Sequence, residues 1–176
     1  MISRDSFSVE EWAQVMSAPA AVGALVVTAD PSGPMGLIGE FRAMMESMQS
    51  YVEAHAGEGS LMAAMKEYMS SKPSEEEQEQ LKQWSEQQQA QMKANKPKSP
   101  EELQQRIRDV VSAAMATLQA KGATAEDMSL FRAMMVSVAE ATANASKEGG
   151  FLGIGGTLVS EKEESILAQI RQELAG

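Results

Sequence analysis

The chain of 176 residues contains no cysteine, one histidine and few aromatic residues, which make up 5% of it. Without cysteine it cannot form a disulfide framework, a thiolate metal site or a cysteine nucleophile, and the reducing cytoplasm is its predicted location. Hydrophobic residues still make up 43% of the chain, so a buried core is expected. Because Met, Leu and Ala are helix-favouring residues that can fill such a core, the composition predicts an all-α fold.

Basic residues are fewer than acidic ones, and the formal net charge is −10. This balance argues against a nucleic-acid partner, because binding to phosphate backbones needs an excess of Lys and Arg. The acidic excess is concentrated in residues 1–90, which favours cations or a basic partner. The longest apolar stretch, Ala18–Ala29, contains Pro19 and is shorter than a bilayer span. We therefore predict no transmembrane segment and no export, whereas peripheral membrane association stays open.

Helix starts are indicated by capping boxes, in which a Ser or Thr stands three residues before an acidic residue. Five such pairs occur: Ser8 with Glu11, Ser74 with Glu77, Ser99 with Glu102, Thr124 with Asp127, and Ser160 with Glu163. Between these starts the apolar residues recur at helical spacing, and no strand-like alternation competes with it. About eight helices are expected, over residues 9–17, 19–29, 34–55, 60–70, 75–94, 100–120, 125–146 and 161–174.

An internal repeat is the clearest pattern in the chain. The five residues Phe41–Met45 (FRAMM) recur as Phe131–Met135, displaced by 90 positions, and each copy lies in an expected amphipathic helix. We interpret residues 1–176 as a single domain in which two related units, near 9–71 and 100–176, form pseudo-symmetric halves around one shared core.

The repeat makes two further predictions about packing. Phe41 and Phe131 are expected at equivalent positions about a pseudo-two-fold axis, and the Phe and Met side chains of both FRAMM copies are expected to be buried. The units are joined by residues 72–99, which are rich in Gln and Glu. This segment is predicted to be a surface helix, and a flexible linker is the alternative.

The sequence offers no clear catalytic set. His55 precedes Gly57 near an expected helix end, where contacts with free carbonyl groups explain it better than catalysis. The spacing of Met62, Met65 and Met69 fits a buried helix face better than a thioether copper site. The segment Gly149–Gly156 is rich in glycine but lacks the preceding strand and the ending of a phosphate loop. We assign no catalytic residue and favour a non-enzymatic role.

Acidic residues beside two expected loops are the candidate metal ligands. Glu148 precedes the glycine-rich segment and Glu163 follows it, while Asp30 precedes a Pro-Ser-Gly turn with Glu40 on the next helix. Carboxylates that converge from a loop and the following helix suit Ca²⁺ or another hard divalent cation. Helix capping and solvation explain the same acids, so both interpretations stay open.

Residues 147–164 (KEGGFLGIGGTLVSEKEE) and, more weakly, residues 24–33 (ALVVTADPSG) resemble the tellurite-resistance TerB-like family. That family is all-helical and pseudo-symmetric, with an acidic loop and a capped helix start in each half. The resemblance implies divalent-cation binding, with Asp30, Glu148 and Glu163 at the acidic motif positions. It also implies a role in a stress-response assembly near the membrane. Glu148 stands where the family has Asp, and Pro31 interrupts the first loop.

Three functions follow from these patterns. The first is a non-enzymatic TerB-like helical protein that acts by protein interaction in a stress response and carries a weak divalent-cation site. The second is a small-molecule-binding protein or enzyme with a Met-lined cleft between the halves. The third is an oligomeric structural protein, so that either a protein partner or a second copy of the chain is expected. The loop from Glu148 to Glu164 is the predicted contact region.

Overall fold

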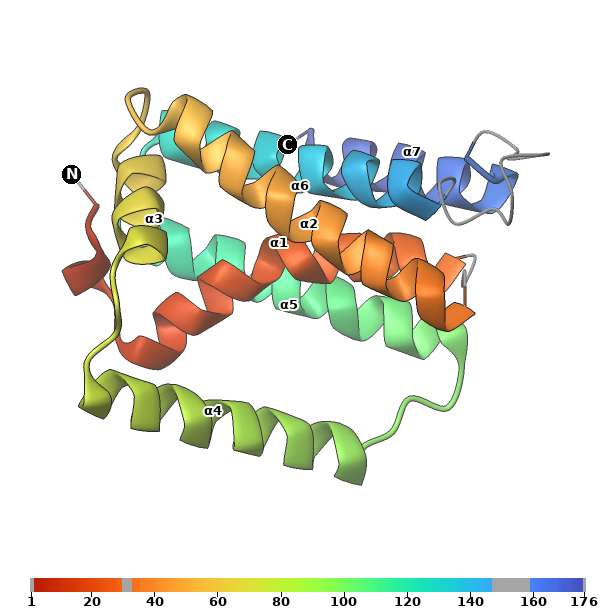
Figure 1. Ribbon diagram of the computed structural model, residues 1–176, viewed down its shortest axis with the longest axis horizontal. Coiled ribbons are helices and arrows are strands. Elements are labelled where there is room, and N and C mark those ends of the chain that lie inside the picture. The colour runs from red at the N-terminus through yellow and green to blue at the C-terminus, as the bar shows by residue number, and fades with distance from the viewer. Residues whose placement is uncertain (1, 30–32, 147–158, 176) are drawn as a thin grey trace.

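The computed structural model describes residues 2–29, 33–146 and 159–175. These residues form seven α-helices and one short 3₁₀ helix, and they contain no strand, which confirms the all-α class (Figure 1). The helices are η1 (Arg4–Ser6), α1 (Val9–Ala29), α2 (Gly33–His55), α3 (Ser60–Ser70), α4 (Glu75–Ala94), α5 (Pro100–Ala120), α6 (Ala125–Ser146) and α7 (Glu161–Leu174).

In all five predicted capping boxes the Ser or Thr caps its helix, and the reciprocal bond from the backbone N–H of the cap to the acidic side chain is present at Ser8, Thr124 and Ser160. In each pair the backbone N–H of the acidic residue donates a hydrogen bond to the Ser or Thr hydroxyl, at 3.1–3.3 Å. Such a cap satisfies a donor that has no partner inside the helix. The starts of α1, α4, α5, α6 and α7 are therefore fixed by local sequence.

The prediction of separate helices over residues 9–17 and 19–29 is wrong, because α1 runs continuously through Pro19. Proline removes one hydrogen bond inside a helix and costs roughly 3 kcal/mol there. Here the cost is offset by burial, since α1 is the central helix of the molecule and buries Trp12, Val15, Leu25 and Val26. The ribbon of α1 changes direction about midway along its length (Figure 1), as expected of a proline-containing helix.

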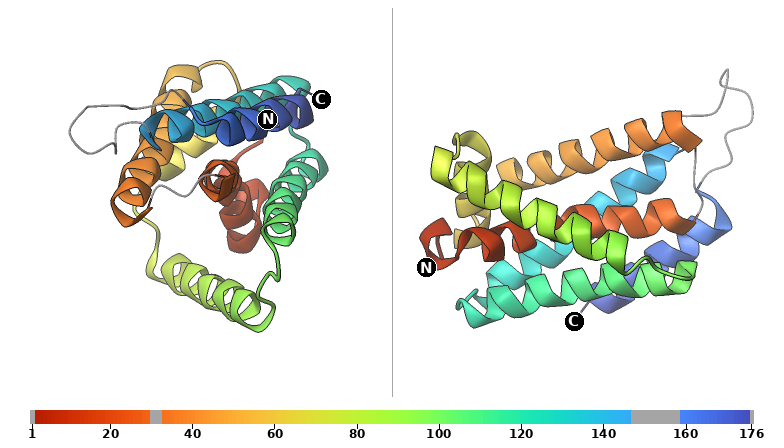
Figure 2. Two further views of the ribbon diagram at one scale, coloured as in Figure 1. Left: turned by 90° about the vertical axis from the view of Figure 1, so that its right-hand side faces the viewer. Right: turned by 90° about the horizontal axis from the view of Figure 1, so that it is seen from below.

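The remaining helices are arranged around α1. Figure 2 shows α1 inside a ring formed by α2, α4, α5, α6 and α7. The closest packing is between α2 and α6, between α1 and α5, and between α1 and α6. Both α2 with α6 and α1 with α5 run antiparallel (Figure 1). The buried core draws residues from α1, α2, α3, α5, α6 and α7.

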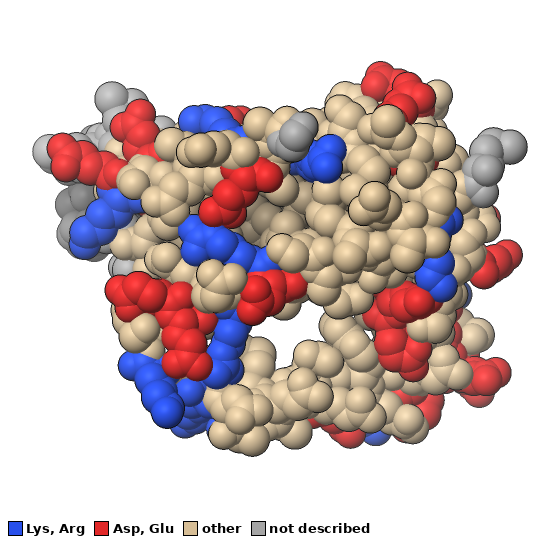
Figure 3. Space-filling model, turned by 180° about the vertical axis from the view of Figure 1, so that it is seen from behind, with Lys and Arg blue, Asp and Glu red and all other residues tan. Residues whose placement is uncertain are grey.

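The segment 72–99 contains α4, which is a surface helix as the sequence predicted. None of its side chains, all of which the structure describes, is buried. Its start is held to the N-terminus by an ion pair between Arg4 and Glu77 at 2.6 Å. The space-filling view shows an opening between α4 and the rest of the molecule (Figure 3). The helix therefore joins α3 to α5 without contributing to the buried core.

Among the residues that the structure describes, one helix, α1, is long and apolar enough to span a membrane by length and composition alone. The helix is longer than the apolar stretch Ala18–Ala29 because it runs without a break through Pro19. The core helix of a globular protein passes the same test, and 44% of the relevant window is buried inside this structure. The predicted cytoplasmic location stays a prediction.

Asp127 connects the start of α6 to the start of α3. It caps α6 by accepting from the Thr124 N–H, at 3.0 Å, and from the Thr124 hydroxyl, at 2.8 Å. The same carboxylate accepts from the N–H of Leu61 at 2.8 Å and from the hydroxyl of Ser60. A Cβ on Gly59 would lie 2.9 Å from Asp127 Oδ1, so the close approach requires glycine. Asp127 therefore caps both α6 and α3.

Candidate functional site

Two predicted cation ligands, Asp30 and Glu148, lie outside the described residues, as does the segment Gly149–Gly156. The third, Glu163, is buried in the first turn of α7. Its carboxylate accepts a hydrogen bond from the Ser160 N–H at 2.8 Å, and its own N–H donates to the Ser160 hydroxyl at 3.3 Å. Glu163 is therefore engaged in capping α7.

Across the described part of the chain, no three side chains of His, Cys, Asp or Glu come together as a metal site requires. Glu40, which the sequence paired with Asp30, is buried on α2. The cation site built from Asp30, Glu148 and Glu163 stays a prediction.

If these three carboxylates hold a hard cation, Ca²⁺ at 100 times its Kd should raise the free energy of unfolding by about 2.7 kcal/mol. Denaturant unfolding measured with Ca²⁺, Mg²⁺ and Mn²⁺ tests this. Glu148→Gln should abolish the increase, while Glu67→Gln, at an exposed position on α3, serves as the matched control. A free energy of unfolding that none of the three cations changes would contradict the prediction.

The single histidine takes part in contacts at the end of α2. His55 Nδ1 lies 2.9 Å from the carbonyl oxygen of Tyr51, and the two rings stack with their centroids 4.1 Å apart. This confirms the interpretation of His55 as a residue that contacts helix-end carbonyl groups. The geometry gives no reason to assign it a catalytic role.

An exposed apolar face on α2 is the first candidate site that the structure adds. Leu37, Ile38, Phe41 and Met45 are 45%, 67%, 60% and 40% exposed, respectively. Their spacing places them along one side of the helix. The predicted burial of Phe41 and Met45 is therefore wrong, whereas Met44, Phe131, Met134 and Met135 are buried as predicted. We call these four exposed residues the α2 apolar face.

The different burial of the two FRAMM copies follows from the number of neighbouring helices. On α2 the buried side chains Glu40, Met44, Met48 and Val52 recur every four residues and form a narrow stripe. In contrast, α6 packs against α1, α2, α3 and α7, so it is buried over a wide arc. The same five residues therefore present Phe131 to the core and Phe41 to solvent.

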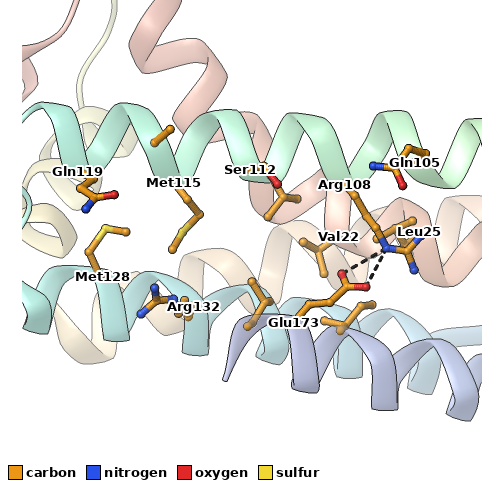
Figure 4. A pocket seen from close by; sticks show the side chains of 14 residues that line it. Val22, Leu25, Gln105, Arg108, Ser112, Met115, Gln119, Met128, Arg132 and Glu173 are labelled. Atoms are coloured by element: carbon orange, nitrogen blue, oxygen red, sulfur yellow. Dashed lines mark hydrogen bonds and ion pairs between the residues drawn. The ribbon is translucent and has the colours of Figure 1, made fainter. Parts of the chain in front are cut away.

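A groove is the second candidate site. It lies between α5 on one side and α6 and α7 on the other, with α1 at its floor, and it has a volume of about 530 Å³ (Figure 4). This value lies within the roughly 300–1,000 Å³ of ligand pockets. Its apolar lining residues are Val22, Leu25, Val111, Met115, Ala116, Met128, Ile170 and Leu174. The second predicted function placed a Met-lined cleft between the halves, and this groove has methionines in its walls.

Polar side chains occupy the two ends of the groove. At one end Arg108 of α5 pairs with Glu173 of α7 at 2.9 Å and donates to Gln169 at 2.9 Å. Arg132 of α6 lies toward the other end, on the same side as Gln119 (Figure 4). Arg132 forms no hydrogen bond or ion pair with any residue that the structure describes.

Sequence reasoning proposed a Met-lined cleft but named no residue of the groove, and it missed the α2 apolar face. On α2, the apolar residues Leu37, Ile38 and Phe41 extend over a wider arc than one core-facing stripe needs, and that width was the available signal. For the groove the sequence carried no comparable signal, because Arg42 and Arg132 stand in identical five-residue sequences. Comparison with known protein families, curated proteins and solved structures found no match to this chain.

Proposed function

We propose that this chain is a non-enzymatic helical protein that acts through protein interaction, with the α2 apolar face as its contact surface. The carrying observation is the exposure of Leu37, Ile38, Phe41 and Met45 on one side of one helix. Contiguous apolar patches rimmed by polar residues are typical of interaction sites in soluble proteins. Large apolar side chains at helical spacing are also the anchors by which helices dock on partners.

A second copy of the chain is the occupant that the charges favour. Arg42 and Glu46 stand one helical turn apart beside the apolar face, and both are well exposed. An antiparallel pair of α2 helices would bring Arg42 of each copy toward Glu46 of the other, so the surface is self-complementary. The commonest soluble oligomers are dimers with such two-fold interfaces. The charges of Arg42 and Glu46 cancel beside the α2 apolar face, although the whole chain carries a net charge of −10.

The internal repeat supports a common origin for α2, which carries this face, and α6, and we include the duplication in the proposal. Ser47 and Ser137, also displaced by 90 positions, face each other across the α2–α6 contact with their hydroxyl oxygens 3.1 Å apart. A contact between equivalent residues of two antiparallel helices is what a local two-fold relation would produce. The TerB-like resemblance and the stress-response role that it implies remain proposals on the sequence alone.

The proposal predicts that the protein is a dimer whose dissociation constant depends on the α2 apolar face. Phe41→Ser should weaken the dimer by about 30-fold or more, because a buried aromatic anchor contributes roughly 2 kcal/mol or more. Sedimentation equilibrium of the wild type and the variant measures this. Met92→Ser removes a similarly exposed apolar side chain, on α4, and is the matched control.

Two results would contradict the second-copy interface. One is a wild-type protein that is monomeric over the whole concentration range. The other is a dimer that Phe41→Ser and Met92→Ser leave equally intact. Because Phe41 is 60% exposed in the monomer, the substitution should leave the fold stable, and a thermal unfolding curve verifies this.

A further inference from the structure

The groove between α5 and α6 is a second site, separate from the α2 apolar face. Little direct packing joins α5 to α6, although both lie against α1. This divergence leaves an open groove above α1, and Val22 and Leu25, each 2% exposed, lie at its floor. Because these floor residues belong to the buried core, the groove is built on a packed scaffold.

The walls of the groove suit an apolar chain. Met115 projects from α5 and Met128 from α6, and the two point into the space between the helices (Figure 4). Methionine side chains are unbranched and adapt to irregular apolar shapes. Ile170 and Leu174 of α7 continue the apolar surface toward the other end. A ligand lying along the groove would contact apolar groups over most of its length.

Arg132 distinguishes this groove from an ordinary packing defect. Five of the six arginines of the chain form ion pairs with carboxylates: Arg4, Arg42, Arg106, Arg108 and Arg171. The sixth, Arg132, is half-buried and lines the groove (Figure 4). A guanidinium partly removed from water favours an anionic partner, and it can bind a carboxylate through two parallel hydrogen bonds.

The charge of the groove supports the same ligand class. Its lining contains two arginines, Arg108 and Arg132, and one carboxylate, Glu173, which is already paired with Arg108. The groove therefore carries one net positive charge on a protein of net charge −10. Gln119 of α5, toward the same end of the groove as Arg132, offers a further side-chain amide donor.

We propose that this groove binds an amphiphilic monoanion, a carboxylate attached to an apolar chain. The carboxylate pairs with Arg132, and the apolar chain lies over Val22 and Leu25 between Met115 and Met128. The Arg108–Glu173 pair closes the far end of the groove. The proposal does not depend on the dimer interface, because neither Arg132 nor the floor residues belong to the α2 apolar face.

Calorimetric titration with decanoate below its micelle concentration tests the proposal, with 1-decanol as the uncharged probe. The wild type should bind decanoate more tightly than decanol. Arg132→Met keeps the apolar stem and removes the charge, and it should weaken decanoate binding by about tenfold or more while leaving decanol binding unchanged. Arg106→Met removes an arginine that pairs with Glu102 outside the groove, and as the matched control it should bind like the wild type.

A second variant tests the location of the site. Ser112 lines the groove and is exposed, so Ser112→Trp should fold normally and block both probes. Two results would overturn the proposal. One is a wild type that binds neither probe, and the other is decanoate binding that Arg132→Met and Ser112→Trp leave at the wild-type affinity.

Discussion

Replacing Phe131 by alanine should lower the free energy of unfolding by about 3–5 kcal/mol, whereas Phe41→Ala should change it by only about 0.5 kcal/mol or less in the monomer. Phe131 is fully buried and Phe41 is 60% exposed, although both begin identical five-residue sequences. The first substitution leaves a cavity in a closely packed core, and the second removes a side chain that solvent already reaches. Urea unfolding of both variants, at concentrations that keep the protein monomeric, measures the difference.

The two phenylalanines control for each other, because sequence neighbours and helix propensity are the same at both positions. Equal losses of stability for the two substitutions would contradict the asymmetric packing of α2 and α6. Met135→Ala and Met45→Ala repeat the comparison at another pair of equivalent positions. Met135 is fully buried and Met45 is 40% exposed, so a larger loss is expected for Met135→Ala.

Asp127→Ala should lower the free energy of unfolding by on the order of 2–4 kcal/mol, because it removes a buried hydrogen-bond acceptor from two helix starts at once. Asp127 is 1% exposed, and without it the buried N–H of Leu61 loses its acceptor. Chemical denaturation measures the loss. Asp109→Ala, at an exposed position on α5, is the control and should change stability by only about 0.5 kcal/mol or less.

The Asp127 network also predicts a dependence of stability on pH. Burial alone would raise the pKa of the Asp127 carboxyl, but hydrogen bonds from Leu61, Thr124 and Ser60 outweigh it and hold the pKa below its ordinary value. A lowered folded-state pKa stabilises the protein above the unfolded-state pKa, which is about 3.9. That contribution is lost as the pH falls through the lowered value. Asp127→Asn should therefore lose less stability than the wild type on acidification below about pH 4.

Local signals in the sequence predicted the helix starts well. The caps at Ser8, Ser74, Ser99, Thr124 and Ser160 depend on residues within three positions of each other, so no knowledge of the tertiary fold was needed. The break predicted at Pro19 was wrong for a tertiary reason: burial of α1 on several sides outweighs the local cost of proline. Short-range rules therefore predicted how helices begin better than whether a helix continues.

Burial and the two candidate surfaces depended on long-range packing that the sequence does not encode in a simple pattern. Identical FRAMM sequences predicted identical environments, but Phe41 and Phe131 have different numbers of neighbouring helices. Arg132 became recognisable as a site residue only when the ion pairs of the other arginines were known. Glu163, in contrast, was named from the sequence as a candidate metal ligand. The same Ser-x-x-Glu motif also predicts a helix cap, and the structure shows Glu163 in that cap.

The double cap at Asp127 has a consequence for the order in which the protein folds. The first turn of α3 has no cap from a side chain of its own segment, and its acceptor lies 66 positions later in the chain. During synthesis, residues 1–99 therefore emerge before the carboxylate that completes α3 and before the helices α5 and α6 that cover α1. We expect the packing of α1 to α3 to remain incomplete until α6 has been made, so that the helices unfold in a single cooperative transition rather than one after the other.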